Sequence, residues 1–327
     1  MLSGRKIRNK WVWGLASVFI FLLIGLQVYA AEIDLVQQAI STRRAKWVAK
    51  ENPVSQLPPE VRKKLLGAPD QPLDTGAPLL APYGAEVGAL PASFDWRSAA
   101  GGNFVTPVRD QKTCGSCWAF STTAALESKC LITFNWPGKD LDLSEQIVLS
   151  CSGGGTCGGG QASVASEYLI SSGTTFDSCY PYTGSNGVCS NACSNWQKRA
   201  YKIDSWQYVS YDGSATAATI KNAIYNNGPV VAWFKVYTDF YYYDSGVYSY
   251  SYGDYEGNHF VLVTGWDDSQ SAFIVKNSWN TTWGTAGYFK IAYIELTGTS
   301  LFGSYTYGYG KAISPKTASS WLELLLM

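Results

Sequence analysis

Apolar residues recur with a helical period in three parts of the chain. The longest pattern begins near Ser116 and runs to Leu131, with polar positions interrupting a broad apolar face. A face of this width predicts a helix packed on a larger body, with Cys117 in its first turn. Two shorter patterns predict helices over residues 161–172 and 215–227, and each of them ends at a glycine.

The second half of the chain changes to a period of two. Strands are predicted over residues 230–236, 260–266 and 272–278. The last strand places Asn277 on the same face as Val275. A helical half followed by a β half predicts an α+β fold of two lobes with a cleft between them.

The N-terminus carries the pattern of a targeting segment. Basic residues precede an uncharged, mostly apolar run from Trp11 to Val28, and the small residues Ala30 and Ala31 follow it. This arrangement predicts a signal peptide over residues 1–30. An uncleaved anchor helix is the alternative, because the apolar run is long for a signal sequence. Either interpretation predicts that the rest of the chain is exported.

Residues 31–90 do not have the composition of an independent core. Eight of the 13 prolines of the chain lie between Pro53 and Pro91. Four apolar residues before them stand at near-helical spacing: Leu35, Ala39, Ile40 and Trp47. They predict one apolar stripe docked on a larger partner, as a propeptide lies on its enzyme, with a solvent-exposed linker as the alternative. At the other end, residues 312–327 carry no assigned function.

Charge and composition exclude several functions. Lys plus Arg and Asp plus Glu each number 25, so the charge balance does not favour nucleic acid or an anionic membrane surface. A membrane contact is expected only if residues 1–30 remain as an anchor. His259 is the only histidine, so imidazole chemistry near neutral pH depends on this residue. We expect no metal and no cofactor.

The string Cys114-Gly115-Ser116-Cys117 allows two interpretations. It is either a redox or metal-binding pair, or a catalytic thiol at the start of a helix with the first cysteine in a disulfide. A redox pair needs a βαβ context and a zinc site needs a second pair of ligands, and neither is apparent. Cys117 is therefore the candidate nucleophile, and His259 and Asn277 follow it by 142 and 160 residues.

Four strings follow one another along the chain: Asp95-Trp96-Arg97, the run from Gln111 to Phe120, Asn258-His259-Phe260-Val261, and Lys276-Asn277-Ser278-Trp279 with Trp283-Gly284. Together they resemble the papain and cathepsin family of cysteine proteases. The resemblance implies a papain-like peptidase domain over residues 91–311, with a helical lobe over about 98–203 and a β-barrel-like lobe over about 204–311. Residues 32–66 resemble the short propeptide of cathepsin B relatives, so residues 31–90 are the expected pro-segment and residues 312–327 a tail.

The resemblance implies a role for each matched residue. Cys117 is the nucleophile, His259 its partner and Asn277 the residue that orients the imidazole. A helix N-terminus and an imidazolium both stabilise a thiolate, which a free thiol with a pKa of about 8.5 forms only in small part at neutral pH. Gln111 is expected to donate, together with the Cys117 N–H, to the tetrahedral oxyanion. Trp279 is expected to shield the His259–Asn277 hydrogen bond from water.

Substrate contacts are also implied by the resemblance. Gly159 and Gly160 match glycines whose backbone pairs with an extended peptide. Trp233, Gln161 and Ala162 match the main specificity pocket, and Trp279 is also expected to bind substrate. Gln161 replaces a residue that is usually apolar, so the preferred side chain stays open.

Three disulfides are expected from the same resemblance: Cys114–Cys157, Cys151–Cys189 and Cys179–Cys193. They leave Cys130 free and buried on the first helix. Export into an oxidising compartment agrees with disulfide formation. The apparent sequon Asn280-Thr281-Thr282 lies inside a catalytic string, and we expect it to be unglycosylated.

The expected function is that of a cysteine endopeptidase, made as a zymogen, which acts through a thiolate–imidazolium pair and a thioester intermediate. Its expected partners are polypeptide substrates and its own propeptide, and we expect a monomer in an extracellular, periplasmic or lysosome-like compartment. Cathepsin B relatives that trim C-terminal dipeptides use histidines on an extra loop, and this chain has only His259. A binding homologue without catalysis and a peptide ligase are the alternatives.

Overall fold

The computed structural model describes residues 32–80, 90–99 and 102–315. The expected signal peptide over residues 1–30 lies outside the described residues, as do residues 81–89 of the pro-segment and residues 316–327 of the tail. Within the described ranges, no helix combines the length and the apolar composition that crossing a bilayer requires.

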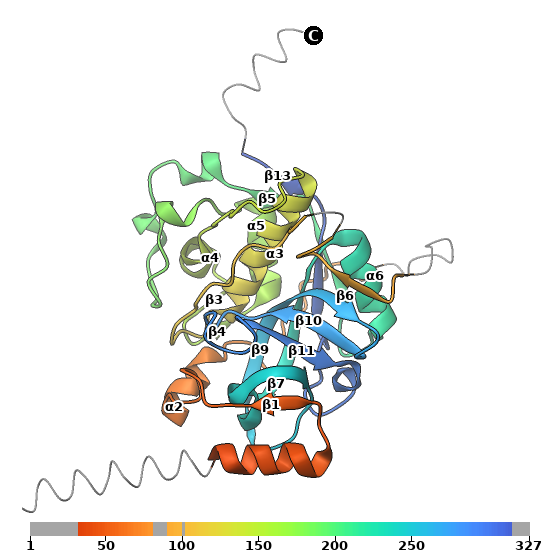
Figure 1. Cartoon of the computed structure of the whole chain (residues 1–327). Coiled ribbons are helices and arrows are strands. Elements are labelled where there is room, and N and C mark those ends of the chain that lie inside the picture. Colours follow the sequence, from red (N-terminus) through yellow and green to blue (C-terminus); the bar gives the residue numbers. More distant parts are fainter. Residues whose placement is uncertain (1–31, 81–89, 100–101, 316–327) are drawn as a thin grey trace, which may run out of the picture.

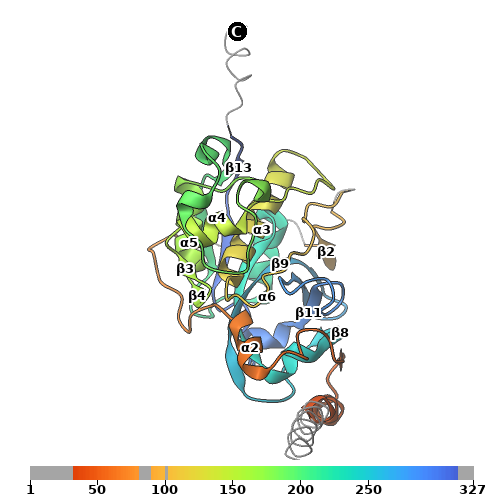
Figure 2. The ribbon, with the colours of Figure 1, turned by 90° about the vertical axis from the view of Figure 1, so that its left-hand side faces the viewer.

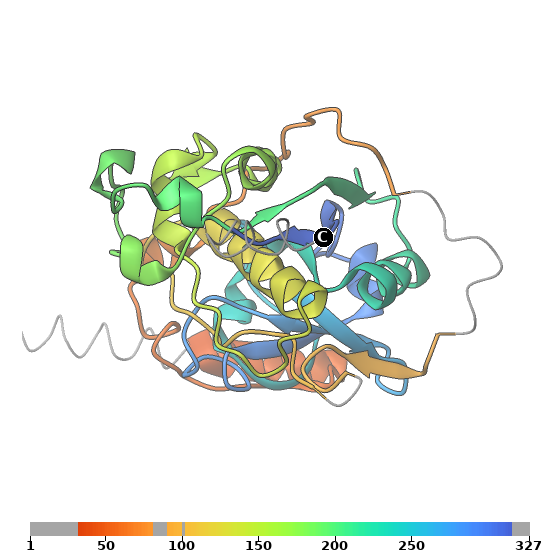
Figure 3. The same ribbon diagram turned by 90° about the horizontal axis from the view of Figure 1, so that it is seen from above.

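A helical lobe packs against a lobe built around a sheet, as the sequence predicts (Figure 1). The helical lobe holds α3 (Cys117–Thr133), α4 (Glu145–Cys151) and α5 (Ala162–Ser171), and α6 (Ala217–Asn227) packs on the β lobe. In Figure 3, α3 is the yellow helix that lies across the strands. The helices predicted from Ser116, over 161–172 and over 215–227 are confirmed as α3, α5 and α6, whereas α4 was not predicted.

Most strands belong to one 9-stranded sheet with the order β1-β8-β11-β10-β9-β7-β12-β6, in which β2 also pairs with β9. The strands predicted over residues 230–236, 260–266 and 272–278 are confirmed as β7, β9 and β10, except that β10 ends at Lys276, so Asn277 follows the strand. The strands of this sheet are β1 (Trp47–Ala49), β2 (Ser93–Asp95), β6 (Trp206–Ser210), β7 (Val230–Tyr237), β8 (Tyr243–Tyr248), β9 (Tyr255–Asp267), β10 (Ala272–Lys276), β11 (Tyr288–Ala292) and β12 (Thr306–Tyr309).

Short elements complete the fold. Two small antiparallel pairs lie outside the main sheet, namely β3 (Gly155–Thr156) with β4 (Gly159–Gly160), and β5 (Lys202–Ile203) with β13 (Ala312–Ile313). Strand β13 therefore starts the segment that was expected to be a tail. The 3₁₀ helices are η1 (Lys63–Leu65), η2 (Asp177–Cys179), η3 (Cys189–Asn191), η4 (Trp196–Arg199), η5 (Thr238–Tyr242) and η6 (Tyr293–Leu296).

Strand β7 supplies two hydrophobic cores, because successive side chains of a strand point to opposite faces. Ala232 and Phe234 belong to the core of the β lobe. Val231 and Trp233 belong to a second core, which includes α3 and α5 residues such as Trp118. Trp233 is therefore directed toward the helical lobe.

The apolar stripe predicted for the start of the pro-segment is partly wrong. Residues 32–43 form a helix, drawn in red in Figure 1, but Leu35 is 44% exposed. Ile33 and Val36 are the buried residues instead, and they join the core of the β lobe. Trp47 is buried in strand β1, not in the helix. The prediction assumed a helical period up to Trp47, whereas the helix ends at residue 43.

The pro-segment covers both edges of the sheet. Strand β1 pairs with β8 at one edge. Leu79 forms a parallel bridge with Tyr208 of β6 at the other edge, where the Leu80 N–H donates to the Tyr208 carbonyl (2.6 Å). Between these edges, α2 (Pro59–Arg62) leads into an extended segment that rises past β3 and β4, drawn in orange in Figure 2. A solvent-exposed linker, the alternative for the start of the pro-segment, does not fit the burial of Val36 and Trp47.

The three expected disulfides are confirmed. Cys114 bonds to Cys157, Cys151 to Cys189 and Cys179 to Cys193. Within the described part of the chain, Cys117 and Cys130 are the cysteines outside these bridges, and both are buried.

Candidate active site

Cys117 is the first residue of α3, and its side chain is fully buried. The backbone N–H groups of a first helical turn point past the helix end, and the helix dipole places partial positive charge there. Ser116, at the N-cap, makes no side-chain capping bond to these groups. The position of Cys117 therefore favours a thiolate, provided that water or a cationic partner also solvates the charge.

His259 lies in β9 and forms a hydrogen bond with the residue that follows β10. Its Nε2 atom is 2.8 Å from Oδ1 of Asn277. The same Oδ1 accepts the backbone N–H of Ser278 (2.8 Å), which identifies it as the carbonyl oxygen of the amide. Nε2 therefore carries the proton. The other ring nitrogen, Nδ1, is buried and has no hydrogen-bond partner among the described residues.

Trp279 covers this hydrogen-bonded pair. Its ring centroid is 4.8 Å from that of His259, and the indole is 2% exposed. Tyr241 stacks on the same indole, and Trp283 meets it edge-on. The imidazole and its amide partner are therefore held in an apolar shell, where a hydrogen bond competes less with water.

Gln111 is held in one orientation by a residue whose role the sequence analysis missed. The Ser278 hydroxyl donates to Gln111 Oε1 (2.6 Å), so Nε2 of the amide is directed to the other side. There it donates to the carbonyls of Leu65 in the pro-segment and of Cys114 (both 2.8 Å). Ser278 lies inside the Asn277-Ser278-Trp279 string, which is the only signal in the sequence that marks it.

A buried polar network joins β10 to α3. Thr106 donates its hydroxyl proton to Glu127 of α3 and accepts a hydrogen bond from Lys276 Nζ (3.0 Å) at the end of β10. Burial raises the pKa of Glu127 to about 7 and lowers the pKa of Lys276 to about 8. Because Asn277 follows Lys276 directly, this network fixes the position of Asn277 relative to α3.

The pro-segment lies between the two lobes, and we call the surface that it contacts there the cleft. The Gly160 N–H donates to the Gly67 carbonyl (2.8 Å), and the Ala68 N–H donates to the Asn258 carbonyl (3.1 Å). Trp233 Nε1 donates to the Pro69 carbonyl (2.9 Å). Two of the expected substrate-binding residues, Gly160 and Trp233, thus bind the pro-segment directly.

The remaining two expected substrate-binding residues lie close by. A Cβ atom added at Gly159 would stand 3.0 Å from the Gly67 carbonyl oxygen, so this glycine also packs on the pro-segment. Trp279 contacts His259, as described above, and no hydrogen bond joins it to the described part of the pro-segment. Gln161, in the expected specificity pocket, accepts the Leu73 N–H through Oε1 (2.9 Å).

Burial under the pro-segment favours the neutral forms of Cys117 and His259. Burial raises the pKa of Cys117 to about 11, although the backbone amides of Phe260 and Gly67 partly oppose this shift. Burial lowers the pKa of His259 to about 4, although the hydrogen bond with Asn277 opposes it. In the enzyme without its pro-segment, we predict the opposite shift for His259, because a Cys117 thiolate would raise the pKa of the imidazole.

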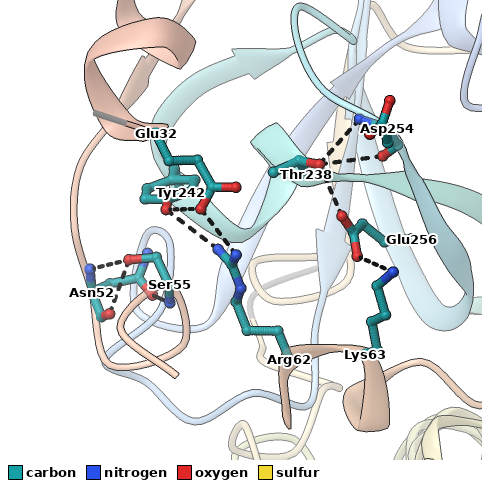
Figure 4. Close-up of polar contacts among 9 residues, drawn as sticks. All are labelled: Glu32, Asn52, Ser55, Arg62, Lys63, Thr238, Tyr242, Asp254 and Glu256. Carbon is teal, nitrogen blue, oxygen red and sulfur yellow. Dashed lines mark hydrogen bonds and ion pairs between the residues drawn. The ribbon is translucent and has the colours of Figure 1, made fainter. Parts of the chain in front are cut away.

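A second set of polar contacts anchors the pro-segment to the β lobe (Figure 4). Arg62 binds Glu32 (2.9 Å) and donates to the Tyr242 hydroxyl (3.3 Å), which in turn donates to Glu32. Lys63 binds Glu256 (3.3 Å). Burial opposes the charge on Arg62, but the Glu32 carboxylate outweighs it and raises the pKa of the guanidinium.

Comparisons with known proteins agree with this geometry. The profile of the papain family cysteine proteases matches residues 90–300. Cathepsin B-like CP3 of Giardia intestinalis is 38% identical over 210 residues, which are 62% of this chain and 69% of that protein. Cathepsin B-like cysteine proteinase 3 of Caenorhabditis elegans is 30% identical over 298 residues, 82% of this chain and 80% of that protein.

Solved precursor structures resemble the whole described arrangement. Procathepsin B S9 from Trypanosoma congolense aligns with a TM-score of 0.72 at 25% identity, over 86% of this chain and 97% of that one. A recombinant stem bromelain precursor aligns with a TM-score of 0.71 at 26% identity, over 88% of this chain and 91% of that one. The chain belongs to the papain family of cysteine proteases, and the form described is that of a zymogen.

Proposed function

We propose that the mature protein is an endopeptidase in which Cys117 attacks the carbonyl carbon of an internal peptide bond. His259 and Cys117 form the thiolate–imidazolium pair, Asn277 orients the imidazole, and Gln111 and the Cys117 N–H bind the oxyanion. His259 gives its proton to the leaving amine, a thioester forms on Cys117, and water then hydrolyses it. The observation that carries the proposal is the His259–Asn277 hydrogen bond, which leaves Nδ1 for the thiol.

Action on internal bonds is supported by the path of the pro-segment. Leu65 binds Gln111 on one side of the site and Leu73 binds Gln161 on the other, so one continuous chain passes through the cleft. A site that accepts a continuous chain in both directions suits internal cleavage. His259 is the only histidine of the chain and is buried beside Asn277, so no second imidazole is available to hold a substrate carboxylate.

The compartment and the assembly state belong to the same proposal. Three disulfides favour an exported protein, as the expected signal peptide does. We propose a secreted or lysosome-like location and a monomeric enzyme.

A long peptide with both ends blocked tests the endopeptidase assignment. The enzyme trimmed to about residue 91 is expected to cut it internally, because no free terminus is required. Cys117→Ala is expected to remove this activity and to keep the fold, whereas Cys130→Ala, a change at the other free thiol, is expected to keep activity. Cleavage that requires a free C-terminus and releases mainly dipeptides would contradict the proposal.

A further inference from the structure

Asp70 of the pro-segment places a carboxylate in the cleft, where the β lobe binds it. Its Oδ1 atom accepts a hydrogen bond from the Tyr255 hydroxyl (2.8 Å) and one from Nδ2 of Asn258 (2.9 Å). These hydrogen bonds, together with the positive charge of Lys235, hold the pKa of Asp70 below its ordinary value. The groups that surround the carboxylate therefore favour a negative charge.

The sheet positions these three groups independently of the pro-segment. Asn258 of β9 stands directly opposite Lys235 of β7, so their side chains lie on the same face. The Tyr255 hydroxyl also lies 2.8 Å from Oδ1 of Asn258, and the Tyr255 ring centroid is 5.9 Å from Nζ of Lys235. Asn258 is 2% exposed. Because these contacts lie within the β lobe, a site for a carboxylate is already formed when the pro-segment leaves.

This site lies a short distance along the cleft from the thiol. The backbone amide of Gly67 contacts Cys117, and Asp70 follows Gly67 by three residues. Between them, the Pro69 carbonyl accepts a hydrogen bond from Trp233 Nε1 (2.9 Å). A chain whose reacting bond lies at Cys117 therefore reaches the site with a side chain about two or three residues from that bond.

We propose that Tyr255, Asn258 and Lys235 form a carboxylate-binding subsite of the mature enzyme, which favours peptide substrates with Glu or Asp at one position. This inference rests on the proposed function. The three groups belong to β7 and β9, so a substrate can present a side chain to them whichever way its chain runs through the cleft. A substrate carboxylate takes the place of the Asp70 carboxylate, with two charge-assisted hydrogen bonds and an attraction to Lys235, whereas Gln or Asn carries no charge.

Internally quenched peptides test this assignment on the enzyme trimmed to about residue 91. One Glu is moved through each position near the cut bond, and a matched series carries Gln. The kcat/KM for Glu is expected to exceed that for Gln at least about 5-fold at one position, about two or three residues from the cut bond. Tyr255→Phe and Lys235→Gln are each expected to lower this ratio about 3-fold or more. Tyr225→Phe, at an exposed tyrosine of α6, is the matched control and is expected to leave it unchanged.

Titration of Cys117 with an epoxide affinity reagent separates this inference from the proposed function. A preparation that the reagent titrates, but that cleaves the Glu and Gln peptides equally well at every position, overturns the carboxylate subsite alone. A preference for Glu that both Tyr255→Phe and Lys235→Gln leave unchanged does the same. A folded preparation with no titratable Cys117 overturns the proposed function and this inference together.

Discussion

His259 is the only histidine of the chain, and the pro-segment leaves it without contact with water. In this form burial lowers the pKa of His259 to about 4 and raises the pKa of Cys117 to about 11. Both shifts favour the uncharged state, because burial in a low dielectric disfavours charge on either group. For the proposed thiolate–imidazolium pair, these shifts mean that the pro-segment opposes the charged state in addition to covering the cleft.

Proton NMR of the single imidazole can follow this change. In the full-length protein the titration midpoint of His259 is expected below the ordinary value of about 6.5. Protonation then favours the open state, so the contribution of His259 to pro-segment docking is complete above the midpoint of the open form and falls as the pH drops from there toward 4. After removal of residues up to about 90, the thiolate is expected to raise the midpoint above 6.5.

The matched control for this titration is Cys117→Ala in the trimmed enzyme. Without a thiolate the midpoint of His259 is expected to drop below that of the trimmed wild type. A folded Cys117→Ala protein with an unchanged midpoint would show that the two groups are not paired.

Single residues of the site differ in how far the sequence reveals them. Cys117, His259 and Asn277 stand in strings that mark their chemistry, and the structure brings them to α3, β9 and the end of β10. The hydrogen bond from Ser278 to Gln111 joins residues 167 positions apart. Nothing local encodes such a contact, so sequence periodicity does not predict it.

At the scale of elements, the long helices follow from their apolar period, and the short or non-local elements do not. Helix α4 has seven residues, too few to establish a helical period. Strand β1 is defined by its partner β8, which lies almost 200 residues away in the chain. The spacing of Trp47 from Ile40 fits a helix, but the helix ends at residue 43 and Trp47 lies in the strand that follows.

The disulfides connect elements of the helical lobe, and their loops differ in length. Cys114–Cys157 closes a separation of 43 residues and Cys179–Cys193 a separation of 14, so loop entropy predicts losses of about 4 and about 3 kcal/mol when each pair is replaced by alanine. Urea unfolding of the two double variants measures these losses. A larger loss for the shorter loop would contradict the entropic account.

At the scale of the whole molecule, the pro-segment is bound at three places. It pairs with β8 at one sheet edge, passes Cys117 in the cleft and bridges to β6 at the other edge. Exposed sheet edges are sites of unwanted pairing, and the pro-segment covers both of them. Removal of this segment would therefore expose Cys117, the proposed nucleophile, together with two strand edges.

Arg62 is expected to be a main anchor of the pro-segment. Its side chain is 3% exposed; it pairs with Glu32, which also belongs to the pro-segment, and both residues bind the Tyr242 hydroxyl of the β lobe. The neighbouring Lys63 is 55% exposed and binds Glu256 of the β lobe. Arg62→Met removes charged hydrogen bonds from a buried site, and a synthetic pro-segment with this change is expected to inhibit the trimmed enzyme at least about 10-fold more weakly. Lys63→Met is the matched control, with an expected change below about 3-fold, because exposed ion pairs contribute little. Equal effects of the two changes would exclude this role for Arg62.

Affinity labelling tests the central claim, that Cys117 is the nucleophile of a protease held inactive by its pro-segment. Full-length protein and enzyme trimmed to about residue 91 are treated with an epoxide peptide analogue, and the modified residue is mapped by mass spectrometry. We predict modification of Cys117 in the trimmed enzyme, little or none in the full-length protein, and none of Cys130 in either. Modification at Cys130 instead of Cys117, or equally fast modification of Cys117 in both forms, would contradict this account.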